Sequence, residues 1–136
     1  MIFVSTRREV LTRYTHTFIW FVEGDTRLSE TAQALIAEPS NEISVSIASL
    51  WEMVIKVSIG KLNFSQPFDV LISSQLATND MTILDISLNH LFVVTQLPFH
   101  HRDPFDRLLI AQSLVDNLPL IGIDGMFDSY GVNRMW

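Results

Sequence analysis

Residues 100–124, HHRDPFDRLLIAQSLVDNLPLIGID, carry the clearest structural pattern in this sequence. The segment 104–116 is apolar nearly all round at helical spacing, which predicts a buried helix. Asp103 is a suitable N-cap for this helix, and Pro104 fits its first position, where a backbone N–H has no helical partner to lose. The segment 118–123 is short and apolar, which favours a buried strand. A buried helix that leads directly into a buried strand is typical of an α/β protein.

The same alternation extends along the rest of the chain. We expect further helices at 29–38, 46–58, 67–77 and 87–96, and strands within 1–14 and at 43–45, 81–84 and 132–135, with a short apolar stretch at 18–22. Two of these helices end at Pro39 and Gly60, which are residues that stop helices. Strands that alternate with helices predict an α/β fold with a mostly parallel sheet. A length of 136 residues corresponds to a single domain, residues 1–136.

Composition excludes several classes of protein. The chain contains no cysteine, so a disulfide scaffold, a thiolate metal site and a cysteine nucleophile are excluded. No apolar run reaches the roughly 18 residues of a membrane-spanning helix. The charges near the start follow the first apolar residues, which is the reverse of a secretory signal. We therefore expect a soluble, cytoplasmic protein.

The net charge of −6, from 15 acidic and 9 basic residues, leaves two interpretations open. A protein that grips nucleic acid mainly through phosphates is expected to be basic. Either nucleic acid is not the partner of this chain, or some of its acids are concentrated in a site that holds cations. The distribution of charge, which the net value does not describe, decides between these interpretations.

Three carboxylates lie where predicted elements begin or end. Asp103 and Asp106 fall at the start of the helix 104–116, where capping and the helix dipole stabilise an acid by roughly 0.3–2 kcal/mol. Asp124 follows the strand 118–123 and precedes a glycine, which is typical of a turn. In an α/β sheet the same place is the mouth of a site. A structural and a functional interpretation are therefore both open for each acid.

Glu52 is a fourth candidate, within the helix 46–58. It follows Ser49 at capping-box spacing, and it precedes Lys56 by four residues, as in a helical ion pair. Its other neighbour in sequence is Trp51, which we expect in the core. A carboxylate close to a core requires a cation or hydrogen-bond donors, so Glu52 is also a candidate ligand.

Separated carboxylates without thiolates fit a site for Mg²⁺ or Mn²⁺, because hard cations take oxygen ligands. Such ions activate water and stabilise charge in phosphodiester cleavage. No histidine spacing typical of zinc occurs, and we interpret His16, His100 and His101 as structural, loop-fixing or substrate-side residues. The glycine-rich nucleotide motifs and the serine-hydrolase elbow are also absent from the sequence.

Four segments together resemble the PIN (PilT N-terminal) domain family, and most of all the VapC-type toxins of toxin–antitoxin pairs. They are THTFIW at 15–20, SIASLWEMVIK at 46–56, HHRDPFDRLLIAQ at 100–112 and IDGMF at 123–127. Their order and spacing match from about Thr15 to Trp136. The resemblance implies a compact three-layer α/β/α fold and a ribonuclease that depends on Mg²⁺ or Mn²⁺.

The resemblance also implies roles for particular residues. Glu52, Asp106 and Asp124 correspond to the second, third and fourth acids of the family, which bind the metal, and Asp103 to an auxiliary acid or the helix cap. Arg102, Arg107, Lys56 and Lys61 are candidates for phosphate contacts, with surface ion pairs as the alternative. An RNA substrate, a cognate antitoxin and a homodimer are the implied partners.

One position departs from the family. The first acid is expected directly before Thr15, where this chain carries Tyr14. A phenol is protonated at pH 7 and is a poor ligand for Mg²⁺. The nearest upstream acid is Glu9. The alternative function is therefore a catalytically impaired PIN domain that binds antitoxin or RNA without cleavage. A third interpretation is an unrelated α/β metal hydrolase, in which the acids coincide by chance.

Overall fold

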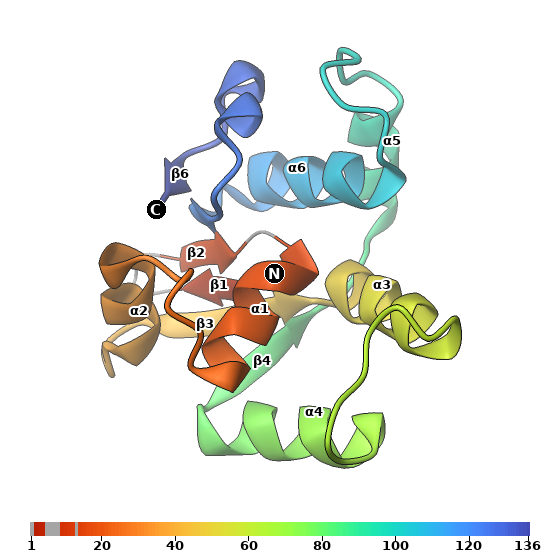
Figure 1. Ribbon diagram of the computed structural model, residues 1–136. Coiled ribbons are helices and arrows are strands. Elements are labelled where there is room, and N and C mark those ends of the chain that lie inside the picture. The colour runs from red at the N-terminus through yellow and green to blue at the C-terminus, as the bar shows by residue number, and fades with distance from the viewer. Residues whose placement is uncertain (1, 5–8, 13) are drawn as a thin grey trace.

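The computed structural model describes residues 2–4, 9–12 and 14–136, with side chains from His16 onward (Figure 1). Six strands form one sheet in this part of the chain: β1 (Ile2–Val4), β2 (Glu9–Thr12), β3 (Glu42–Ser46), β4 (Met81–Leu84), β5 (Leu120–Ile121) and β6 (Arg134–Met135). The pairings β4–β3, β3–β2, β2–β5 and β5–β6 are parallel, and β1 pairs with β3 antiparallel. The prediction of a mostly parallel sheet is therefore confirmed.

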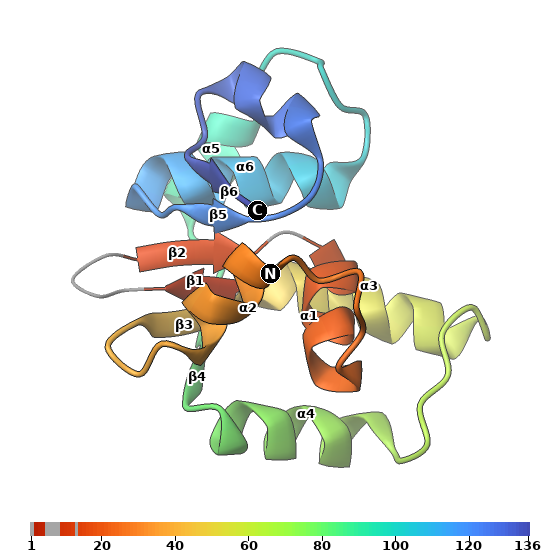
Figure 2. The same cartoon turned by 60° about the vertical axis from the view of Figure 1, so that its left-hand side comes forward.

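Helices cover both faces of this sheet. They are α1 (Tyr14–Glu23), α2 (Glu30–Ala37), α3 (Ile47–Ser58), α4 (Phe68–Thr78), α5 (Leu88–Val94) and α6 (Pro104–Asp116), with a 3₁₀ helix η1 (Gly125–Tyr130). Figures 1 and 2 show α5 and α6 together on one side of the strands and α4 on the other. The three-layer α/β/α architecture is thus confirmed.

Two buried clusters fill the space between the layers. Leu120 packs with α6 residues in one cluster, and its neighbour Ile121 packs with α1, α2 and α3 residues in the other. Successive residues of a strand point to opposite faces, so a two-residue strand contributes to both clusters. This double burial explains why the sequence around β5 is apolar without alternation.

Local signals placed most elements within two or three residues of their observed bounds. The Oγ atoms of Ser29 and Ser46 accept from the backbone N–H groups of Ala32 and Ala48, and these bonds begin α2 and α3. Gly60 follows α3 with a φ of 74°, a left-handed conformation that glycine adopts without strain. The predicted strands 118–123 and 132–135 are shorter in the structure, at two residues each.

Three expectations need correction. The apolar stretch 18–22 is the end of a ten-residue helix, α1, that begins at Tyr14. The segment 1–14 holds two strands rather than one, and the first is antiparallel to β3. Trp51 is 58% exposed instead of lying in the core, and its ring meets that of Phe105, at the start of α6, in a T-shaped arrangement.

The parallel register brings the carboxyl ends of three strands to one edge of the sheet. Leu11 of β2 pairs with Ser44 of β3, and Thr12 pairs with Ile121 of β5. The segments that follow these strands carry Tyr14, the helix α3 and Asp124, so all three start from the same edge. Ligand sites of parallel sheets form at this edge. None of the helices in the described ranges combines the length and the hydropathy that a membrane span requires.

Candidate active site

Two contacts hold α3 against α6 in a defined register. Ser46, the N-cap of α3, donates a 2.6 Å hydrogen bond from its hydroxyl to Oε1 of Gln112, near the end of α6. Further along α3, the ring of Trp51 meets the ring of Phe105, at the start of α6, edge-on with centroids 5.3 Å apart. The two contacts show that α3 and α6 run antiparallel where they pack together. Glu52 and Asp106 directly follow the two aromatic residues.

Glu52 is a buried carboxylate in the middle of α3. It is 8% exposed, and its Oε2 lies 3.7 Å from Nζ of Lys56, one helical turn later. The predicted ion pair is therefore present. The capping-box interpretation is wrong, because α3 already begins at Ile47 and is capped by Ser46 rather than Ser49.

Asp103 and Asp106 are neighbours in sequence with different surroundings. Oδ1 of Asp103 accepts from the backbone N–H groups of Phe105 and Asp106 at 2.8 and 3.2 Å, so this exposed residue is the N-cap of α6. Asp106 is 4% exposed at the third helical position. The positive end of the helix dipole favours a negative charge there. The cap is supplied by Asp103, so capping does not account for the carboxylate of Asp106.

Asp124 is joined to the loop that precedes α6. It caps η1 by accepting from the N–H of Met126 at 2.8 Å, and its Oδ2 lies 3.3 Å from Nε2 of His101. The backbone N–H of His101 donates to the Tyr130 hydroxyl at 2.7 Å. The interpretation of His101 as a loop-fixing residue is thereby confirmed. The link to Asp124 has no signal in the sequence, because 23 positions separate the two residues.

The cationic candidates differ in accessibility. Arg107 is 6% exposed, and its guanidinium donates to the carbonyl oxygens of Val94, Leu97, Pro98 and His101 at 3.0–3.4 Å. These bonds hold the segment between α5 and α6, and we leave Arg107 out of the proposed phosphate contacts. Arg102 is exposed on that segment, and Lys56 and Lys61 line a pocket beside α1.

The acidic residues carry the type of donor atom that binds a hard divalent cation. Carboxylate oxygens are the donors that Mg²⁺ prefers, and this ion commonly takes only one or two carboxylates and completes its shell with water and substrate oxygens. Over the described ranges, no three histidine, aspartate or glutamate side chains are grouped closely enough to hold an ion. The two buried carboxylates on α3 and α6 are therefore suited to a water-rich site rather than to a closed cage of protein ligands.

Tyr14 is the first residue of α1 and follows β2 at the carboxyl edge of the sheet. This is the place at which the resemblance predicts the first acid. The phenol ring and its relation to Glu52 and Asp106 lie outside the described side chains.

These features define an α/β protein with acidic residues at the carboxyl edge of a mostly parallel sheet. The family model described as PIN domain matches residues 15–133, and the chain belongs to the PIN domain family. A comparison with curated proteins found no match. PIN domains are generally nucleases, so the family match supports a nuclease and an interaction with nucleic acid at this general level.

Proposed function

We propose that this protein is an endoribonuclease that depends on Mg²⁺ or Mn²⁺ and uses Glu52, Asp106 and Asp124 as its acidic residues. The observation that carries the proposal is the burial of Glu52 and Asp106 on two packed helices at the carboxyl edge of the sheet. A buried carboxylate costs free energy unless a cation or donors compensate it. Lys56 offsets part of this cost for Glu52, and two carboxylates at the edge where α/β proteins place ligands also supply the oxygen donors that a divalent cation prefers.

Each residue has a part in this proposal. A bound divalent ion would supply Lewis acidity and an activated water for attack on the phosphodiester. Glu52 and Asp106 contribute the negative charge that holds the ion, and His101 orients the carboxylate of Asp124. Asp103 keeps Asp106 in place by capping α6. Lys56, beside Glu52, and the exposed Arg102 offer positive charge to the substrate phosphates.

The test is cleavage of single-stranded RNA with Mg²⁺ or Mn²⁺ and with EDTA. We expect metal-dependent cleavage by the natural chain and a loss of at least about 100-fold in Asp106→Asn and Glu52→Gln, the range for removing a group that stabilises developing charge. Asp69→Asn, at an exposed acid in the first turn of α4, is the matched control and should keep full activity. Metal-independent cleavage, or full activity in both acid variants, would contradict the proposal.

Tyr14→Asp adds a carboxylate at the position where this chain departs from the family. This variant distinguishes two outcomes. If the natural chain is silent and Tyr14→Asp cleaves, the natural site is impaired, and binding of antitoxin or RNA without cleavage becomes the favoured function. If the natural chain cleaves RNA, the site tolerates Tyr14. The added carboxylate should then lower the metal concentration that half-maximal cleavage requires.

We also propose that the protein is the toxin of a VapBC-type pair, that residues 1–136 form one domain, and that it acts in the cytoplasm as a homodimer inhibited by an antitoxin. Exposed apolar side chains support a protein partner; on α3 and α5 they are Trp51, Val54, Ile55, Leu88, Leu91 and Phe92. Induced expression should arrest growth, and Asp106→Asn should relieve the arrest. Light scattering of the purified chain at a monomer mass would contradict the dimer.

A further inference from the structure

A pocket of about 390 Å³ between α1 and the end of α3 gathers positive and aromatic side chains. Arg27, Lys56 and Lys61 line it together with the indole of Trp20. The guanidinium of Arg27 lies 5.0 Å from the centre of the Trp20 ring. The centres of the His16 and Trp20 rings are 5.8 Å apart. A volume of this size accommodates one small ligand or one nucleotide unit.

Three cationic side chains line this pocket, and two of them are paired with acids: Arg27 with Asp25 at 2.7 Å and Lys56 with Glu52 at 3.7 Å. The described lysines and arginines are Arg27, Lys56, Lys61, Arg102, Arg107 and Arg134. Half of them line the pocket, where Glu23 is the only acid in the lining. Among the described side chains, Lys61 is thus the cation of this pocket whose charge no ion pair offsets, and it supplies the local attraction for an anion.

The turn after α3 folds the backbone of Lys61 back against the last turn of that helix, and Lys56 and Lys61 line the same pocket. Gly60 has a φ of 74°, and the backbone N–H of Lys61 then donates to the carbonyl of Lys56 at 2.9 Å. Lys56 is paired with Glu52, whereas Lys61 has no ion-pair partner among the side chains that the structure describes. Lys61 is therefore the cation best placed to bind a phosphate, and Lys56 connects the pocket to the proposed acidic site.

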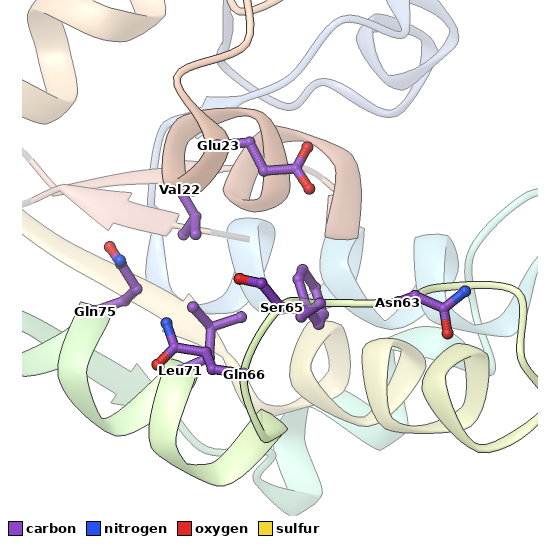
Figure 3. Close-up of a pocket in the computed structure, with 8 residues that line it drawn as sticks. Val22, Glu23, Asn63, Ser65, Gln66, Leu71 and Gln75 are labelled. Carbon is purple, nitrogen blue, oxygen red and sulfur yellow. The ribbon is translucent and has the colours of Figure 1, made fainter.

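A second pocket, of about 380 Å³, adjoins the first at Glu23, which lines both. Half of its lining residues have uncharged polar side chains, namely Asn63, Ser65, Gln66 and Gln75. Figure 3 shows Val22 and Glu23 on α1 across the pocket from Ser65, Gln66 and Gln75. Amides and hydroxyls of this kind form hydrogen bonds with base edges, and a glutamate accepts from an amino group of a base.

We infer that the two pockets form a binding track for consecutive nucleotides of single-stranded RNA, leading away from Glu52. The first pocket takes a phosphate on Lys61 and a base on the aromatic side chains, and the second pocket reads the edge of the next base. Cationic grooves with aromatic platforms are the usual means of holding a single strand. Concave pockets require bases that are not paired, which excludes a duplex. This inference rests on the proposed ribonuclease function and names its substrate site.

The test measures binding of short oligoribonucleotides of U, A or C by fluorescence anisotropy. The intact chain carries Asp106→Asn and is kept in EDTA, and a gel checks that the RNA stays uncut. In this background, Lys61→Gln should weaken binding to all sequences by about three- to tenfold and lower the salt dependence by about one phosphate contact. Gln33→Glu, on the exposed side of α2, changes the net charge equally and should leave binding unchanged.

Gln66→Ala examines the second pocket. It should bring the affinities for U, A and C closer together without changing the salt dependence, because an amide reads bases and not phosphates. Three results would each overturn the track. The first is an equal effect of Lys61→Gln and Gln33→Glu on binding. The second is an unchanged base preference in Gln66→Ala, and the third is stronger binding of duplex RNA than of single strands.

Failure of the track and failure of the nuclease proposal are distinguishable. RNA cleavage by the natural chain, together with unchanged binding in Lys61→Gln and Gln66→Ala, would reject only the track. Reduced binding in these variants, with no cleavage by the natural chain, would support the track and reject the nuclease.

Discussion

The hydroxyl of Ser46 donates a 2.6 Å hydrogen bond to Oε1 of Gln112, and both side chains are completely buried. The same Ser46 oxygen accepts from the N–H of Ala48 and begins α3, while Nε2 of Gln112 donates to the carbonyl of Asp85 at 3.3 Å. One buried polar pair therefore joins the end of β3, the start of α3 and the body of α6. It sets the relative position of the helices that carry Glu52 and Asp106.

Replacement of Gln112 by leucine should destabilise the protein by about 1–3 kcal/mol, because the buried Ser46 hydroxyl loses its acceptor. Urea unfolding measures the change. Gln33→Leu, at an exposed position of α2, is the control and should stay within about 0.5 kcal/mol of the natural chain. Equal midpoints for the two variants would show that the buried pair contributes nothing to stability.

Arg107→Lys should lower stability by about 1–3 kcal/mol, because a lysine cannot reproduce the buried guanidinium fork that donates to four backbone carbonyls. Hydrogen exchange should accelerate first in residues 94–101. If Arg107 instead contacted an RNA phosphate, Arg107→Lys would leave stability unchanged and would weaken RNA binding. That second pattern would reinstate Arg107 as a substrate contact.

Asp103→Ala should cost about 1 kcal/mol of stability, the usual value of a helix cap, whereas Asp103→Asn should cost almost nothing. Thermal or urea unfolding of both variants measures this difference. If Asp103 acts only as the cap, RNA cleavage by Asp103→Asn stays at the natural level. A loss of cleavage in the stable Asp103→Asn variant would assign the carboxylate charge to the site itself.

Asp25 offers a test of the α1–α2 connection by pH. Hydrogen bonds from the side chain and the backbone of Arg27 lower the pKa of Asp25 from its ordinary 3.8 to about 2. Because the folded-state pKa is the lower one, its stabilising effect is present above about pH 4 and is lost as the pH falls towards 2. NMR titration of the carboxyl carbon should show this pKa, and Arg27→Gln should return it towards 3.8. An unperturbed titration in the natural chain would contradict the pair.

The sequence was sufficient for the helices with strong local signals. Ser46, Asp103 and Pro104 mark helix starts within a few residues of chain, and Gly60 marks a stop, so α3 and α6 were predicted close to their observed bounds. Such signals act between residues less than one turn apart and need no tertiary contact.

Other features required packing between distant segments. Trp51 was expected in the core, yet the way α3 lies on α6 leaves it mostly exposed. Arg107 resembled a surface cation in the sequence, and only the folded segment before α6 supplies the carbonyls that surround it. Neither outcome is encoded in the neighbouring residues.

The sequence by itself therefore determined the α/β class, the order of the elements and the identity of the candidate acids, because caps, helix stops and hydrophobic period are local properties. Tertiary structure alone decided that Ser46 meets Gln112, that His101 meets Asp124, and that Lys61 shares a pocket with Trp20. These contacts join residues 66, 23 and about 40 positions apart, and they form only when several layers pack together.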